Sequence, residues 1–245
     1  MLAAACREKP KPPARTEPWL ASAHASASAG PTLRRLAYRL TQSRVEFELP
    51  AKRASPHGRV GRARGELDVD LDDLSRTTGS VSLDLTSIEL LGGSGEPDGT
   101  NTTRALDWLE LGSGSDERRT LRDLVFRITS LDAGHLVQAP GEEKAPKRRE
   151  LQSNWDVRGE LSLHGVRAPQ NAGVALTLTP GADPAGPPAE LLIRSRRPLV
   201  VVLGTHDIRP RDARGVLVAK DQAVLGDHVG REARVTFELR FVPRP

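Results

Sequence analysis

Near its end the chain reads Ala233-Arg234-Val235-Thr236-Phe237-Glu238-Leu239-Arg240-Phe241, and apolar and polar residues alternate throughout this run. Successive side chains of a β-strand point to opposite faces, so one face of the run is apolar and the other is charged. This period of two predicts a half-buried strand rather than a helix. The same alternation occurs at Leu67–Leu71, Val81–Leu85, Val157–Leu163 and Val174–Leu178. Strands of this kind must share one apolar interior.

Longer strand candidates surround these runs and bring their number to about eight. Several exceed the usual strand length of ~5–6 residues, which favours a closed barrel over a small sandwich. Gly61, Gly65 and Gly159 fall inside strand candidates, where they would permit the bulges or bends that closure requires. The candidates are Leu36–Leu40 continuing into Arg44–Leu49, Arg59–Leu71, Ser80–Leu90, Leu124–Leu131, Asn154–His164, Gly173–Thr179, Glu190–Leu203 and Glu232–Val242.

One short helix is predicted at Thr102–Leu111, where Leu106 and Leu109 have helical spacing. Thr100 or Thr102 would supply its N-cap, because a hydroxyl oxygen can accept a hydrogen bond from the first turn. The predicted fold class is therefore all-β, a single antiparallel eight-stranded barrel with one short helix.

Cys6 is the one cysteine of the chain, which excludes an internal disulfide. Small residues lead from Leu2 into Cys6, and this resembles the lipobox of bacterial lipoproteins, in which the cysteine is lipidated. Leucine stands four places before the cysteine rather than three, and no basic or long apolar segment precedes it. We expect residues 1–6 to be the remnant of a lipoprotein signal, with a start codon further upstream. An incidental alanine-rich start is the alternative.

Residues 7–32 are rich in Lys, Pro, Ala and Ser, so they cannot bury enough apolar area to fold. They are predicted to form a disordered tether, which as a flexible coil would span roughly 28 Å. The folded domain is expected at residues 33–245. Its longest apolar runs are far shorter than the ~20 residues that a membrane helix needs, so no bilayer span is expected.

The net charge of +4 comes mostly from arginines that are dispersed among acids, and aromatic residues are 3% of the chain. Nucleic-acid-binding proteins concentrate basic residues on one face and usually add aromatic platforms on which bases stack. This composition therefore predicts solvated strand faces and no nucleic-acid partner.

The order and spacing of several segments resemble the YceI-like family, the lipocalin-like polyisoprenoid-binding proteins of the bacterial envelope. The most specific segment is Val157–Val166, which is similar to the family's glycine, alternating strand and His-Gly-Val turn. The others are Tyr38–Leu40 with Ser43–Phe47, Gly65–Leu74, Ser80–Ile88, Trp108-Leu109, Leu124–Arg127, Val229-Gly230 and the strand to Phe241.

This resemblance implies an up-and-down, lipocalin-like barrel as a YceI-like domain at residues 33–245. It also implies a location in the bacterial periplasm or cell envelope, where a lipidated Cys6 would provide the membrane contact. The charged loop at residues 139–150 and the run at 204–226 depart from the family pattern. The second run is expected near the barrel mouth, so the identity of the ligand is left open.

The resemblance further implies an elongated apolar pocket along the barrel axis that holds a prenyl chain. The alternation agrees, since the inward positions carry mostly branched aliphatic side chains and few of the aromatic platforms that a sugar site would use. We expect an isoprenoid or other long-chain lipid as partner, and no cofactor besides such a bound lipid. The expected ligand contacts are Tyr38, Phe47, Phe126, Trp155, Val157, Leu161, Leu163, Leu176, Ile193, Val201, Val235, Phe237, Leu239 and Phe241.

The same inward residues would also suit a solid core, because small eight-stranded barrels can be filled by their own side chains. In that case the protein would be a non-binding envelope interaction module, with a partner contacting the loops at 139–150 or 204–226. A measured cavity distinguishes this alternative from a lipid carrier. The sequence leaves homodimer formation open.

No catalytic or metal-ligating residues are expected. The six histidines include no pair at the spacing of a helical zinc site, and no nucleophile-elbow, phosphate-loop or dinucleotide motif occurs. A convergent hydrolase arrangement is not excluded by the linear sequence, but we expect that the protein is not an enzyme. His164 is predicted to be a turn residue rather than a ligand contact. Arg194, Arg196 and His206 are candidates for contact with a polar head group at the rim, although solvated surface is the preferred interpretation.

Overall fold

The computed structural model describes residues 35–50, 55–112, 121–136, 151–183, 186–209, 214, 216 and 231–244. The chain divides into two units, residues 1–32 and 33–245, and every described residue belongs to the second. The predicted lipidation site Cys6 and the predicted tether at 7–32 lie outside the described residues, as does most of the two loops expected to contact a partner.

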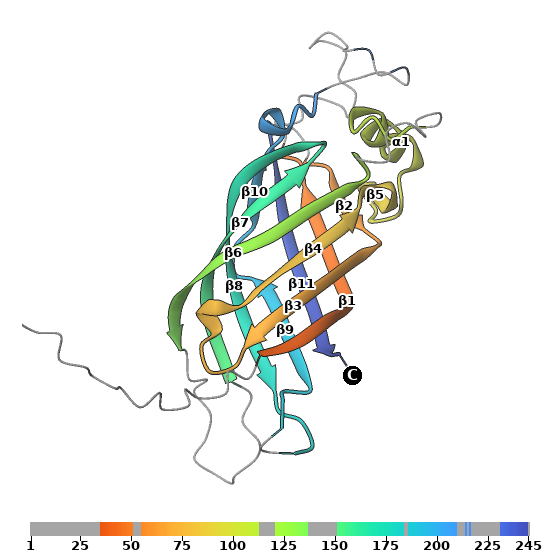
Figure 1. The fold of residues 1–245 in the computed structure, drawn as a ribbon. Helices are drawn as coiled ribbons and strands as arrows, with labels where there is room; N and C mark the ends of the chain where they lie inside the picture. Colours follow the sequence, from red (N-terminus) through yellow and green to blue (C-terminus); the bar gives the residue numbers. More distant parts are fainter. Residues whose placement is uncertain are drawn as a thin grey trace, which may run out of the picture. The chain divides into compact units, whose positions relative to one another are not determined.

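The second unit is a closed antiparallel β-barrel (Figure 1). Strands that are close in the sequence pair around the wall, and the last strand, β11, pairs with the first, β1, to complete the cylinder. The strands are β1 (Arg35–Glu48), β2 (His57–Val60), β3 (Ala63–Asp70), β4 (Thr78–Asp84), β5 (Ile88–Leu91), β6 (Asp123–Leu136), β7 (Leu151–Leu163), β8 (Val166–Thr179), β9 (Glu190–Ser195), β10 (Leu199–Val202) and β11 (Glu232–Pro243).

The eleven strand segments occupy eight positions around the barrel. β2 and β3 both pair with β1, so they are two parts of one broken strand. β4 and β5 flank the short helix η2 (Leu85–Ser87), and they pair with β3 and β2 respectively. β9 and β10 both pair with β11. The predicted eight-stranded, up-and-down barrel is therefore confirmed.

Glycines and bulges occur where the strands bend. Gly61 lies in the break between β2 and β3, and its N–H donates to the carbonyl of Ser87 across the wall. Gly159 lies opposite a bulge in β6, between Ile128 and Ser130. Gly65 pairs with Val81 in an uninterrupted ladder, so β3 has no bulge there. A bulged strand twists more strongly, which helps a barrel to close.

β1 has a bulge of its own, where the register shifts between Leu40 and Gln42. One extra residue reverses which side chains face inward. Tyr38 before the bulge and Val45 after it are therefore both buried, although their numbers differ in parity. Alternation read along the whole of β1 would have placed one of them outside.

The single α-helix of the described chain, α1, spans Gly99–Trp108, three residues earlier than predicted. Its N-cap is Asp98, whose carboxylate accepts from Asn101 N, so the predicted threonine cap is wrong. Asp is among the strongest N-cap residues, and here it takes that role. Thr102 instead accepts a hydrogen bond from Leu90 N at 2.9 Å and docks the helix on β5. Among the described helices, none has the length and apolar character needed to cross a bilayer.

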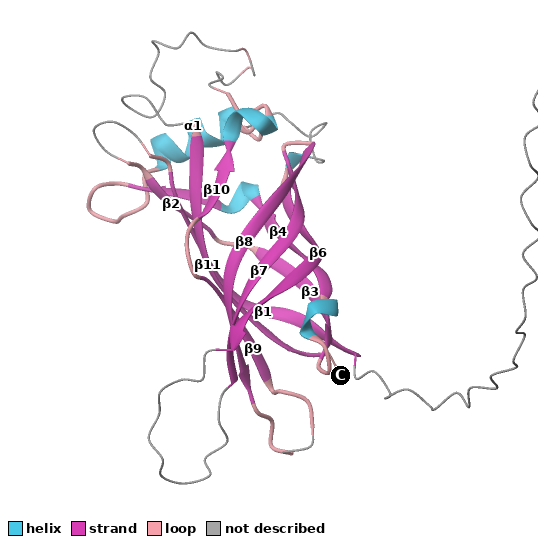
Figure 2. Ribbon diagram, turned by 90° about the vertical axis from the view of Figure 1, so that its left-hand side faces the viewer, coloured by secondary structure: helices cyan, strands magenta, loops and turns pink. Residues whose placement is uncertain are grey.

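The strand directions place two distinct ends on the barrel (Figures 1 and 2). The α1 end carries α1, the β7–β8 turn and the short helix η4 (Leu203–His206). The opposite end, here called the η1 end, carries η1 (Leu74–Arg76) and the loop between β8 and β9.

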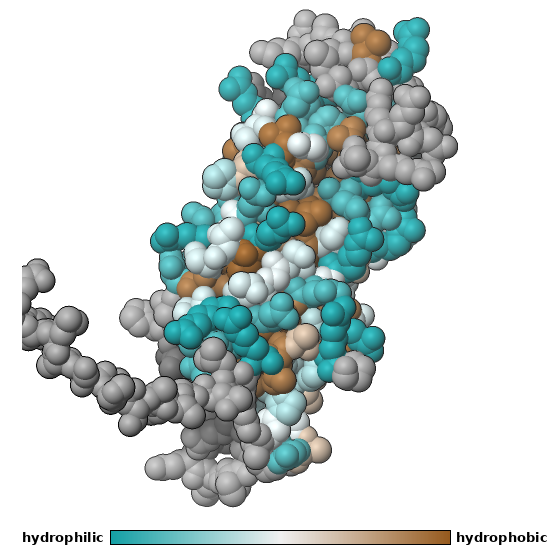
Figure 3. Space-filling model, in the orientation of Figure 1, coloured by the Kyte–Doolittle hydropathy of each residue, from teal (hydrophilic) through white to brown (hydrophobic). Residues whose placement is uncertain are grey.

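The outer surface is mainly polar, with scattered apolar residues on the face drawn in Figure 3. Many outward arginines pair with acids along the barrel wall. Arg194 of β9 pairs with Glu238 of the adjacent β11, and Arg196, just after β9, pairs with Asp156 of β7, each at 2.8 Å. Exposed ion pairs of this kind contribute little stability, about 0–1 kcal/mol each. The two arginines that were candidates for a head-group contact are thus paired on the surface.

Candidate ligand-binding cavity

The barrel encloses a cavity of about 240 Å³ along its axis. Its wall extends from Trp108 of α1 at one end to Leu74 of η1 at the other. Among the described residues that line it, Thr77 is the one without an apolar or indole side chain. The barrel interior therefore has space that its own side chains do not occupy, which favours a ligand-binding barrel over the filled barrel of the alternative interpretation.

All of the expected ligand contacts except Tyr38 line this cavity. Inward alternation on the strands brings them together, as the pattern of the sequence predicts. Their contact with a ligand stays a prediction. These lining residues are Phe47, Phe126, Trp155, Val157, Leu161, Leu163, Leu176, Ile193, Val201, Val235, Phe237, Leu239 and Phe241.

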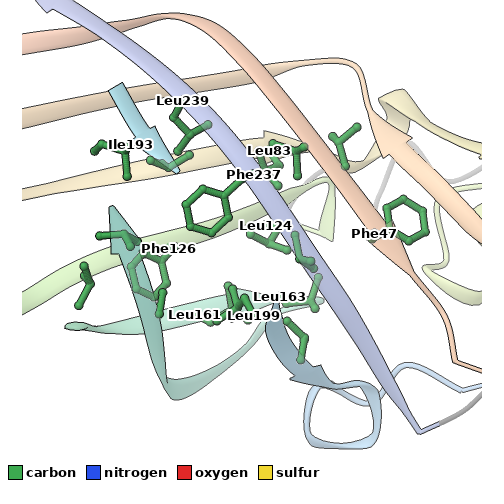
Figure 4. Close-up of a pocket in the computed structure, with 18 of the residues that line it drawn as sticks. Phe47, Leu83, Leu124, Phe126, Leu161, Leu163, Ile193, Leu199, Phe237 and Leu239 are labelled. Atoms are coloured by element: carbon green, nitrogen blue, oxygen red, sulfur yellow. The ribbon is translucent and has the colours of Figure 1, made fainter. Parts of the chain in front are cut away.

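The four phenylalanines of the chain, Phe47, Phe126, Phe237 and Phe241, all line the cavity. Figure 4 draws Phe126 and Phe237 in the same part of the cavity, and Phe47 well apart from them. Gly58 pairs with Phe47 across β1 and β2, and a Cβ atom on Gly58 would collide with that ring and with the Glu89 carbonyl. A glycine beneath the ring thus lets the phenylalanine lie against the wall.

Tyr38 is fully buried but does not line the cavity, so its expected place among the lining residues is wrong. It lies near the η1 end, where its hydroxyl donates to the Pro188 carbonyl at 3.2 Å. Burial raises the pKa of Tyr38 to about 12, because the phenolate would lose its hydration. The residue ties β1 to the β8–β9 loop instead of offering its ring to a ligand.

Trp155 combines an apolar face on the cavity with a satisfied polar edge. Its indole Nε1 donates to Ser153 Oγ at 2.7 Å, and both residues are buried on β7. Buried indole N–H groups usually find a partner, and this bond fixes the orientation of the ring. Ser153 itself does not line the cavity.

The α1 end supplies lining residues that strand alternation does not reveal. Ala105, Trp108 and Leu109 of the α1 region face the cavity, together with Leu203 and Ile208 around η4. Trp108 Nε1 and Thr77 Oγ1 are buried atoms without a hydrogen-bond partner in the structure. The helical spacing of apolar residues predicts the helix itself, but it does not predict where the helix docks on the barrel.

His164 and His206 lie outside the cavity lining and bond to the backbone. His164 Nδ1 donates to the His206 carbonyl, and His206 Nδ1 donates to the Val166 carbonyl, each at 3.2 Å. His206 is 2% exposed, so its interpretation as solvated rim is wrong. It is buried because η4 follows β10 and turns the ring back toward the top of β8. Among the described residues, no group of three or more metal-ligating side chains gathers in one place.

The family model of the YceI-like domain matches residues 38–241, which span the barrel from β1 to β11. The chain belongs to the YceI-like family. No curated protein matches the sequence significantly.

One solved structure supports this fold. A polyisoprenoid-binding domain from Saccharophagus degradans is 15% identical, with a TM-score of 0.56 over 85% of this chain and 99% of that one. BcnA from Burkholderia cenocepacia is 14% identical, with a TM-score of 0.48 over 81% of this chain and 95% of its own.

The most specific segment of the YceI-like pattern, Val157–Val166, forms the β7–β8 hairpin. His164 and Gly165 are its two turn residues, with φ of 52° and 76°, between the paired residues Leu163 and Val166. Two positive φ values match the twist of adjacent strands in a tight hairpin. The turn role predicted for His164 is confirmed.

Proposed function

We propose that this YceI-like protein binds one elongated apolar lipid, a polyisoprenoid or similar chain, in the barrel interior and sequesters or carries it. The observation that carries this proposal is the axial cavity, whose described lining is hydrocarbon apart from Thr77 and the tryptophan rings. The similarity to a structure described as a polyisoprenoid-binding domain supports the ligand class.

Hydrocarbon burial supplies the driving force. Each buried methylene contributes about 0.8 kcal/mol in gross terms. Ordering a flexible chain consumes much of this, and ligands of drug size retain about 0.3 kcal/mol per non-hydrogen atom. Since no described lining residue is charged, the cavity selects its ligand by length and shape and not by a charged head group.

We also propose that the protein acts in the bacterial cell envelope, anchored through a lipidated Cys6, and that it performs no chemistry on its ligand. The lipobox-like approach to Cys6 supports the anchor. An apolar lining without an acid or base among its described residues supports a binding role. A Cys6→Ser variant should lose incorporation of a labelled fatty acid. Equal labelling of the variant and the wild type would contradict the anchor.

Extraction of the native ligand tests the main proposal. Protein purified from bacterial cells is extracted with organic solvent, and the extract is analysed by mass spectrometry. About one prenyl or other long-chain lipid per protein is expected, and the emptied protein should bind geranylgeraniol saturably with a negative heat-capacity change. An extract without lipid, together with no saturable binding by the emptied protein, would refute the proposal.

A further inference from the structure

The barrel wall has a seam between the upper part of β8 (residues 166–171) and β10, at the end that carries α1 (Figure 2). β8 pairs with β9 from Val174 to Thr179, and the ladder ends with the bond from Arg196 N to Gly173 O. Beyond this point β8 pairs with β7 and β10 pairs with β11. Within the described chain, no backbone hydrogen bond joins β8 to β10.

The sequence encodes this break. Pro169 lies within β8 and Pro198 immediately precedes β10. Proline lacks the N–H of a ladder, so it is found at strand edges and strand starts. Pro169 keeps its place opposite Glu160 of β7, and its missing donor is tolerated because the other edge of β8 has no strand to pair with.

Side chains bridge the seam where backbone bonds are absent. Gln170 Nε2 donates to the Val200 carbonyl at 3.1 Å. At the top, His206 Nδ1 donates to the Val166 carbonyl, and His164 Nδ1 donates to the His206 carbonyl. Bonds of this kind contribute about 0.5–1.5 kcal/mol each, so separating the two edges costs far less than opening a full ladder.

Apolar surface lies on both sides of the seam. Leu199 and Val201 of β10 and Ala172 of β8 line the cavity behind it. Val200 and Val202, on the outward side of β10, are 40% and 49% exposed. They are two of the three large apolar side chains that are exposed in the described chain. A hydrocarbon chain crossing here would meet apolar side chains of β10 on the outer surface and apolar side chains of the cavity on the inner one.

We propose that the seam between β8 and β10 is the portal through which the lipid enters and leaves. This inference rests on the proposed lipid-binding function. The hydrogen bond from Gln170 to the Val200 carbonyl holds the two edges together, and the wall opens sideways when this bond breaks. The ligand need not pass under α1, whose residues line that end of the cavity.

A reversible cross-link across the seam tests the portal. Gln170→Cys and Val200→Cys are introduced in a Cys6→Ser background and joined with a short bifunctional thiol reagent that contains a cleavable bond. The protein is loaded with radiolabelled geranylgeraniol, and transfer to excess phosphatidylcholine vesicles is timed. Joining the cysteines should slow release about tenfold or more, and cleavage of the linker should restore the rate.

The matched control joins Ala175→Cys to Arg194→Cys, two residues paired directly across the intact β8–β9 ladder. This link should leave the rate of release unchanged. Gln170→Ala should speed uptake and release equally, by about fivefold for a lost bond of ~1 kcal/mol, and so leave Kd unaltered.

The outcomes separate the two proposals. Saturable binding with release that is insensitive to the seam cross-link, or slowed equally by the control link, overturns the portal and leaves lipid binding intact. No binding of geranylgeraniol by the wild type overturns both.

Discussion

Enlarging Ala172 distinguishes a hollow barrel from a filled one by the sign of its effect on stability. Ala172 is a buried residue of β8 that lines the cavity opposite Val157. In a close-packed core, extra methylene groups force side chains off their rotamers and destabilise the protein by about 1–3 kcal/mol. In a cavity they fill space that no other atom occupies, and stability increases.

The magnitude follows from the atoms that are added. Ala172→Leu introduces three carbon groups, each worth about 0.8 kcal/mol when buried, so the ligand-free protein should gain roughly 2.4 kcal/mol. The cavity of about 240 Å³ has room for these atoms. At ~24 cal/mol per Å³, an empty space of this volume destabilises the protein by ~6 kcal/mol, which is more than the expected gain. For a domain of this size the gain should raise Tm by about 5–10 °C.

The assay is thermal and urea unfolding of delipidated protein, followed by titration with geranylgeraniol. Ala172→Leu should be more stable than the wild type and should bind the lipid more weakly, because the side chain occupies part of its space. The control is Ala175→Leu, three residues along β8, which is half-buried and does not line the cavity. Its stability should change by less than ~0.5 kcal/mol. Destabilisation of Ala172→Leu by 1–3 kcal/mol would refute the hollow interior.

Three further substitutions test the elements that hold the cavity open. Because burial raises the pKa of Tyr38 from 10.0 to about 12, its stabilisation is complete below pH 10 and is lost as the pH rises through 12. The free energy of unfolding of the wild type should therefore fall by about 3 kcal/mol over this range, and that of Tyr38→Phe should not, and equal pH profiles would contradict the burial. Ser153→Ala should lose about 1–3 kcal/mol in urea unfolding, because the Trp155 indole N–H stays unpaired; no loss would show that water replaces the partner. Gly159→Ala should lose about 1–3 kcal/mol, since its Cβ would lie 2.5 Å from a backbone carbonyl, whereas Gly93→Ala has open space and should be neutral; equal stability of the two would count against the tight packing.

Much of the cavity wall could be predicted from the sequence because inward parity is a local property. Phe237 and Leu239 lie on one strand, and their alternation alone places both inside. Position along the barrel axis is a different matter, since it depends on the register between strands that are distant in sequence. Tyr38 is buried, but its pairing with Pro243 and its bond to the Pro188 carbonyl hold it at the η1 end, outside the cavity lining.

Interruptions of the alternation explain the other differences. Glu190–Leu203 reads as one strand, but Pro198 divides it, and Arg196 makes the last bond of the ladder. After Val202 the chain enters η4, so period-two parity no longer applies and His206 is buried instead of solvated. Trp108 reaches the cavity because of the docking of α1, which depends on a bond between residues twelve positions apart, Leu90 and Thr102. Local periodicity contains no information on such contacts.

The most direct measurement of the central claim is a crystal structure of the protein saturated with geranylgeraniol. The account predicts continuous density for an extended chain on the barrel axis, in contact with Phe126, Leu161 and Phe237, which line the cavity from three different strands. A cavity that stays free of the chain, with the lipid absent or bound on the outer surface, would contradict it.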